Sequence, residues 1–115
     1  MASNQTKKYA ASHKFARIAP RKARLVADMI RGKGIEDALA TLEFSPRRGA
    51  WFIKSVLRSA IANAEEANLD VGRLFVSESR VDEGPTIKRF QPKDRGRSHP
   101  IMKRTSHIHV SVDVR

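Results

Sequence analysis

The sequence of 115 residues contains no cysteine, which excludes a disulfide framework and any chemistry that depends on a thiolate. It also lacks an apolar run long enough to cross a membrane. Residues 1–12 carry charges but no apolar segment of the kind found in secretory signals, so we expect no such signal there. These absences fit a protein of the cytosol.

Acidic residues are scarce: 12 Asp and Glu face 23 Lys and Arg, giving a formal net charge of +11. Residues 1–24 contain no acid at all. An excess of charge of one sign opposes folding into a compact state, because like charges repel. Nucleic acid is the usual partner that neutralises an excess of positive charge. An anionic membrane surface is the alternative, but the basic residues are not gathered on one face of an amphipathic helix.

Patterns for catalysis and metal binding are largely missing too. His107 and His109 share one strand face, but zinc needs more ligands than these two and Asp113 supply. The neighbouring carboxylates Glu65-Glu66 and Asp82-Glu83 point in different directions on a helix or a strand, so neither is a catalytic pair. No glycine-rich phosphate loop is present. We therefore predict no enzymatic activity, no metal and no cofactor.

Residues 84–105 form the stretch around which the rest is organised. They contain seven basic residues and one acid, and three prolines that block a helix. Strands are predicted on either side, over about 74–82 and 107–115, so a long antiparallel hairpin is the economical connection. Its turn is expected at 92–96, where Pro, Asp and Gly occur. The stretch is either a solvated flexible loop or an extended basic arm that enters a polyanion; we favour the arm.

The remaining chain, long enough for one domain, predicts a first strand over 9–18 and three helices. The helices begin at Pro20, near Ile35, and near Pro46 with Ser45 as cap, the last running to about Asn68. Residues predicted to be buried recur at helical spacing or alternate along the last strand. They are Leu25, Val26, Met29 and Ile30; Ile35, Ala38, Leu39 and Leu42; Ile53, Val56, Leu57, Ala60, Ile61 and Ala64, extended by Trp51 or Phe52; and Ile108, Val110, Val112 and Val114.

Basic residues inside and outside the arm are the candidates for RNA contact. Arg47 and Arg48 lie in the first turn of a helix, where the dipole disfavours cations; a phosphate nearby would reverse this penalty, and the alternative is two solvated arginines. Phe90 either stacks on a base or packs against Ile101 or Met102, and packing is slightly favoured. The candidates are Lys7, Lys8, Lys14, Arg17, Arg21, Lys22, Arg24, Arg47, Arg48, Lys88, Arg89, Lys93, Arg95, Arg97, Lys103 and Arg104.

Four blocks of sequence resemble the bacterial ribosomal protein L twenty-two family of the large subunit. They read APRKARLVADMIRGK, SAIANAEEAN, VDEGPTIKRFQPKDRGR and KRTSHIHV, and they occur in the family's order between Phe15 and Val114. The resemblance implies an α+β fold: a small three-stranded antiparallel sheet packed beside three helices, with a long protruding β-hairpin arm. It implies a single domain over residues 1–115, with the arm at about 84–105.

The same resemblance implies a structural constituent of the cytoplasmic ribosome that binds large-subunit ribosomal RNA, supports subunit assembly and contacts neighbouring ribosomal proteins. It further implies that the arm tip helps line the nascent-peptide exit tunnel, next to the passing peptide, to an extension of protein L four and to the macrolide site. Ile87-Lys88-Arg89 match the ascending arm. The tip matches Pro92, Lys93, Asp94, Arg95, Gly96 and Arg97.

Two positions depart from the family pattern. Lys93-Asp94 replace an arginine and a small residue, and Asp94 either faces the tunnel lumen or pairs with Arg95 or Arg97. Ala19 replaces the usual serine before the first helix, which removes a cap worth about 1 kcal/mol. The alternatives to a ribosomal role are a general nucleic-acid chaperone, an RNA-processing enzyme using His107 or His109, and a membrane-surface protein.

Overall fold

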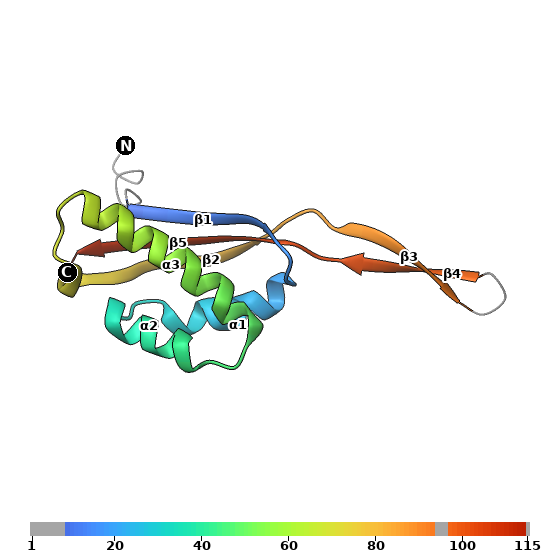
Figure 1. Ribbon diagram of the computed structural model, residues 1–115, viewed down its shortest axis with the longest axis horizontal. Helices are drawn as coiled ribbons and strands as arrows, with labels where there is room; N and C mark the ends of the chain where they lie inside the picture. The colour runs from blue at the N-terminus through green and yellow to red at the C-terminus, as the bar shows by residue number, and fades with distance from the viewer. Residues whose placement is uncertain (1–8, 94–96, 115) are drawn as a thin grey trace.

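The computed structural model describes residues 9–93 and 97–114, with the backbone alone along 87–93 and 97–102. Figure 1 shows helices and a sheet at one end of an elongated molecule, 62 Å in its longest extent, with a hairpin projecting from them. The described elements are β1 (Tyr9–Ala16), α1 (Pro20–Ile30), α2 (Ile35–Phe44), α3 (Arg48–Glu66), a 3-10 turn (Val71–Arg73), β2 (Leu74–Glu83), β3 (Ile87–Lys93), β4 (Arg97–Lys103) and β5 (Ser106–Val114).

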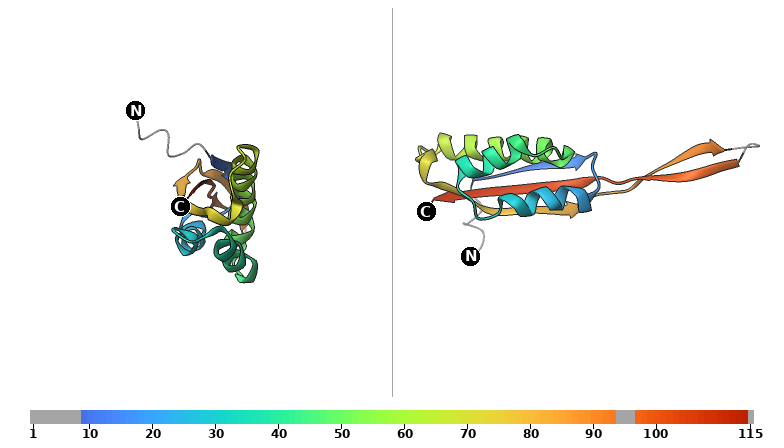
Figure 2. Two further views of the ribbon diagram at one scale, coloured as in Figure 1. Left: turned by 90° about the vertical axis from the view of Figure 1, so that its left-hand side faces the viewer. Right: turned by 90° about the horizontal axis from the view of Figure 1, so that it is seen from below.

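The strands of the body form an antiparallel sheet in the order β1-β5-β2, so the last strand lies in the centre. The pairs Tyr9↔Val112 and Leu74↔Val114 set its register. Figure 2 shows the helices on one face of this sheet. The predicted α+β class, with helices beside an antiparallel sheet and a hairpin arm, is confirmed. Within the described residues, no helix is long and apolar enough to span a membrane.

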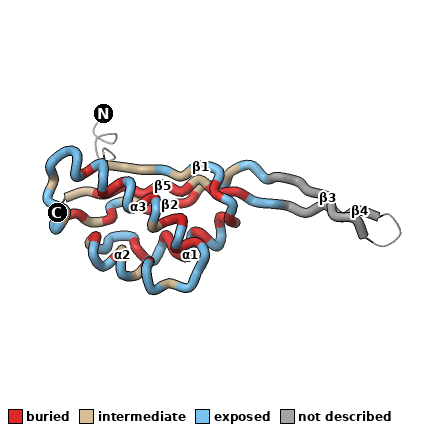
Figure 3. The backbone as a smooth tube through the Cα atoms, viewed as in Figure 1, coloured by how far each residue is buried: buried red, intermediate tan, exposed pale blue. Residues whose placement is uncertain are grey.

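The core lies between the sheet and the helices, where buried residues gather in Figure 3. On β5, Ile108, Val110 and Val112 are fully buried, because alternate side chains of a strand point to the same face. The α3 stripe was predicted correctly from its helical spacing. Its buried residues are Phe52, Ile53, Val56, Leu57, Ala60, Ile61 and Ala64.

The buried face of α1 differs from the prediction. Leu25 and Met29 were expected in the core, but they are 49% and 39% exposed. Alanines take their place, because Ala23 and Ala27 complete an i, i+3, i+4, i+7 stripe with Val26 and Ile30. The α1 helix begins at Pro20 as predicted, after Ala19, which provides no side-chain cap.

The start of α3 is a second correction. The helix begins at Arg48, with Arg47 at the cap position, two residues after the predicted start at Pro46. The Ser45 hydroxyl does not cap it; the hydroxyl accepts a hydrogen bond from the amide of Arg47 at 3.3 Å. At the other end, Asn68 adopts the left-handed conformation expected after a helix, with φ 62°.

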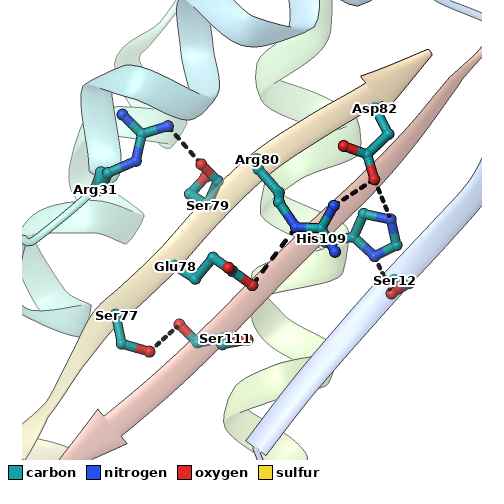
Figure 4. Close-up of polar contacts among 9 residues, drawn as sticks. All are labelled: Ser12, Arg31, Ser77, Glu78, Ser79, Arg80, Asp82, His109 and Ser111. Carbon is teal, nitrogen blue, oxygen red and sulfur yellow. Dashed lines mark hydrogen bonds and ion pairs between the residues drawn. The ribbon is translucent and has the colours of Figure 1, made fainter. Parts of the chain in front are cut away.

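The strands of the sheet bring two more corrections. The first strand ends at Ala16, not at residue 18. It contains a bulge between His13 and Ala16, where Phe15 has φ 60° and is exposed. The side chains that alternate with the buried residues of β5 were expected to be exposed to solvent. Instead, His107 and His109 are half-buried and Ser111 is buried. Side chains of β1 and β2 flank this central strand and cover it (Figure 4).

The arm is an antiparallel pair of strands, β3 and β4, in register from Ile87↔Lys103 to Lys93↔Arg97. The last described pair of the arm is Lys93↔Arg97, and most of the turn predicted at 92–96 lies outside the described residues. Asp94, Arg95 and Gly96 lie outside the described residues, and so do the side chains of Phe90, Ile101 and Met102. The backbone register sets Phe90 opposite Pro100.

The root of the arm is fixed around Gly84, where β2 leaves the sheet. The Gly84 amide donates to the Thr105 carbonyl at 3.0 Å, and the hydroxyl of the buried Thr105 donates to the Pro85 carbonyl at 2.6 Å. A Cβ at Gly84 would lie 2.5 Å from the Thr105 hydroxyl. A side chain here therefore requires a shift of the buried Thr105 side chain or of the backbone.

We expect Gly84→Ala to destabilise the fold by about 2 kcal/mol, as overpacking of a tight site does, and to lower Tm by roughly 10 °C. Thermal unfolding followed by circular dichroism measures this. Gly34→Ala is the matched control, because a Cβ at Gly34 meets no atom within 4 Å. Equal Tm values for the two variants would show that the arm root tolerates a side chain.

Candidate nucleic-acid interface

A pocket of about 830 Å³ lies at the root of the arm, between the β1–α1 connection, the start of α3 and the end of β4. We call it the arm-root pocket. Basic residues from three distant parts of the sequence line it, and all seven of them were predicted to contact RNA. The lining consists of Arg17, Ile18, Ala19, Arg21, Lys22, Leu25, Arg47, Arg48, Gly49, Lys103 and Arg104.

Two helix beginnings bring these basic residues together. Pro20 is buried and starts α1, which places Arg21 and Lys22 in the first turn. Arg47 and Arg48 hold the cap and first positions of α3. Neither helix has a side-chain cap, so the positive ends of both dipoles add to the side-chain charges. An anion placed here would be attracted by side chains and by backbone amides alike.

Gly49 allows α1 and α3 to approach each other at this point. A Cβ at Gly49 would lie 3.3 Å from both the Ile18 Cδ1 and the Val26 Cγ2 atoms, which is tighter than ordinary van der Waals contact. Residues larger than glycine would separate the two helices and their arginines. The sequence carried one signal of this: an isolated glycine inside a helical pattern often has a packing reason.

The charges around the arm-root pocket are not compensated within the described part of the chain. No carboxylate lines the pocket there, and none of its seven basic side chains forms an ion pair within the described residues. Elsewhere cations are paired: Arg31 with Asp28 at 2.8 Å, and Lys54 with Glu43. Repulsion among the pocket cations is relieved only when an external anion binds.

The other predicted contact residues lie in different surroundings. Arg24 lies outside the arm-root pocket, and its Nε atom donates to the Val81 carbonyl at 3.1 Å, joining α1 to β2. Lys14 is exposed on β1. Backbone alone is described for Lys88, Arg89, Lys93 and Arg97. Lys7, Lys8 and Arg95 lie outside the described residues.

His109 of β5 takes part in a polar network with side chains of β1 and β2 (Figure 4). The Nδ1 atom of His109 lies 2.7 Å from the Ser12 hydroxyl, and its Nε2 atom lies 3.3 Å from an Asp82 oxygen. Burial lowers the pKa of His109 and Arg80 lowers it further, while Asp82 opposes both. No group of three or more potential metal ligands occurs among the described residues. The network serves to join β1, β5 and β2.

The comparison with known proteins agrees with the geometry. The family described as ribosomal protein L22p/L17e matches residues 11–113. The large ribosomal subunit protein uL22 of Ligilactobacillus salivarius (strain UCC118) is 56% identical over 91% of this chain and 92% of its own length. The proteins of the same name from Lacticaseibacillus casei (strain BL23) and Lactobacillus helveticus (strain DPC 4571) are 56% and 55% identical, each over 89% of this chain and 88% of its own length. The chain therefore belongs to the ribosomal protein L22p/L17e family.

Proposed function

We propose that the arm-root pocket and the arm bind large-subunit ribosomal RNA. Membership of the family makes the chain a structural protein of the large subunit of the cytoplasmic ribosome, assembled with ribosomal RNA and other ribosomal proteins, and not an enzyme. The observation that carries the proposal is the gathering of seven cations around one pocket with no carboxylate from the described residues. Phosphate groups are the anions that such a surface meets in a ribosome.

The arm extends this surface away from the body. A strand of seven residues, such as β3, spans roughly 23 Å. We propose that the arm passes between RNA segments and that its tip lines the nascent-peptide exit tunnel, close to the macrolide site. The proposal is supported by the hairpin register, in which Lys93↔Arg97 is the last described pair, at the opposite end of β3 and β4 from Ile87↔Lys103.

The salt dependence of RNA binding tests the proposal. Filter binding of the full chain to deproteinised large-subunit ribosomal RNA is measured between 50 and 200 mM salt. We expect the affinity to fall on the order of a thousandfold, because each phosphate contact releases a condensed counterion. An affinity that barely changes would contradict the proposal. Equal affinity for unrelated duplex DNA would instead favour a general nucleic-acid chaperone.

A further inference from the structure

A second groove runs along the outer face of α3, with a volume of about 440 Å³. We call it the α3 groove. Its residues recur at helical spacing and therefore form one continuous stripe. It is lined by Trp51, Lys54, Ser55, Arg58, Ser59 and Ala62. Of its two cations, Lys54 is paired with the carboxylate of Glu43, which lies outside the lining.

Trp51 is the only tryptophan of the chain, and it is 67% exposed. The sequence left open whether Trp51 or Phe52 extends the buried stripe of α3, and Phe52 takes that position, at 8% exposure. The two rings make a T-shaped contact, with centroids 5.0 Å apart and planes at 80°. This contact orients the indole while most of its surface stays open, so little side-chain freedom remains to be lost on binding.

The α3 groove continues the arm-root pocket along the same helix. Arg48 lines the pocket and lies one turn before Trp51, about 4.5 Å along the helix axis. Its guanidinium lies 5.6 Å from the centre of the Phe52 ring, which Trp51 also contacts. Two turns beyond Trp51 lies Arg58, which forms no ion pair within the described part of the chain. Its interaction with the nearby carboxylate of Glu43 is weak: Lys54 is the main cause that lowers the pKa of Glu43, and Arg58 adds a smaller contribution. Cations therefore stand on both sides of an exposed aromatic ring.

The chemistry of the lining favours a nucleotide over a protein side chain. Apart from Trp51 and Ala62, the lining is polar or charged, and it offers no large aliphatic side chain of the kind found in the core of a protein interface. An aromatic ring between cations is the arrangement that binds unpaired nucleotides, because the base stacks and its phosphates meet the charges.

We propose that the α3 groove is a stacking site for an unpaired nucleotide of large-subunit ribosomal RNA. Its base lies on Trp51, and its flanking phosphate contacts Arg58. The inference rests on the proposed RNA-binding function and adds a site outside the arm and the arm-root pocket. It assigns α3 an RNA contact with two parts: stacking on Trp51, which depends little on salt, and a phosphate contact at Arg58, which depends on salt.

Tryptophan fluorescence reports directly on this site, because Trp51 is the only emitter of its kind. We expect deproteinised large-subunit ribosomal RNA to quench the emission. We expect Trp51→Ala to weaken binding about tenfold without changing its salt dependence, and Trp51→Phe to retain most of the affinity. Arg58→Ala should instead reduce the slope of log affinity against log salt by about 1.

Phe44, which is 86% exposed and lies outside the groove, supplies the matched controls. Phe44→Ala should leave the affinity unchanged, and Phe44→Trp in a Trp51→Phe chain should show no quenching. The stacking site is overturned, and the proposed function stays intact, if RNA binds in a salt-dependent way but does not quench Trp51. The same holds if Trp51→Ala binds RNA with the affinity of wild type. Absence of salt-dependent binding overturns both. Impaired subunit incorporation of Trp51→Ala with normal RNA affinity would assign the groove to a protein neighbour and overturn the proposal.

Discussion

Replacing Arg47 and Arg48 together by glutamate is expected to lower the affinity for large-subunit ribosomal RNA on the order of a hundredfold. Each change removes an attraction to phosphate and adds a repulsion. The slope of log affinity against log salt should fall by about 2, one for each lost contact. Filter binding across a salt series measures both quantities.

Loss of folding cannot account for this effect. Arg47 and Arg48 stand at the cap and first positions of α3, where the helix dipole disfavours cations and favours acids by about 0.3–1 kcal/mol. Glutamate at these positions should therefore leave α3 as stable as before, apart from the loss of the Arg48–Phe52 contact. Unfolding by urea, compared with wild type, verifies this.

A control with the same change in net charge separates a site from general attraction. Lys33 and Arg73 are exposed and lie outside the arm-root pocket. Their joint replacement by glutamate changes the net charge as much as the Arg47 and Arg48 pair does. We expect it to weaken binding only a few-fold. Equal losses for the two pairs would contradict a localised interface.

Removing the arm is expected to separate folding from RNA attachment. Because Ile87 and Lys103 are register partners, an Asn-Gly turn can join them in place of residues 88–102. This deletion removes five basic residues and one acid, so the salt slope should fall by roughly 3. The core between the helices and the β1-β5-β2 sheet stays intact, and we expect Tm to change by only about 3 °C.

The shortened chain should still enter large subunits, since the arm-root pocket remains. It should leave them at a lower salt concentration than the full chain does. Sedimentation of subunits from cells expressing either form, followed by washes of increasing salt, measures this difference. Identical wash profiles would show that the arm contributes no RNA contacts.

Much of the fold was predictable from the sequence, because buried apolar residues recur with the period of the helix or strand that carries them. Ile108, Val110 and Val112 alternate, and α3 carries an apolar stripe over most of its length. The same rule was insufficient where apolar residues occupy more than one face. In α1, alanines face the core and Leu25 does not, and between Trp51 and Phe52 only packing decides which side chain is buried.

The sequence was sufficient to select the basic residues of the candidate site, but not to predict how they are arranged in space. Charge alone selected Arg21 and Arg24 alike, yet Arg21 lines the arm-root pocket while Arg24 holds the backbone of β2. The pocket exists because Gly49 lets two helices approach, and because the hairpin returns to the body beside them at Lys103. These are long-range packing effects, which local spacing does not encode.

Co-sedimentation of the tagged full chain with large subunits tests the central claim most directly. Lysate is separated on a sucrose gradient, and the large-subunit fraction is washed in high salt. We predict that the protein remains with the subunit, because the arm and the arm-root pocket hold ribosomal RNA at separate places. Release at moderate salt, with the protein spread over all cellular RNA, would contradict this account and favour a general nucleic-acid chaperone.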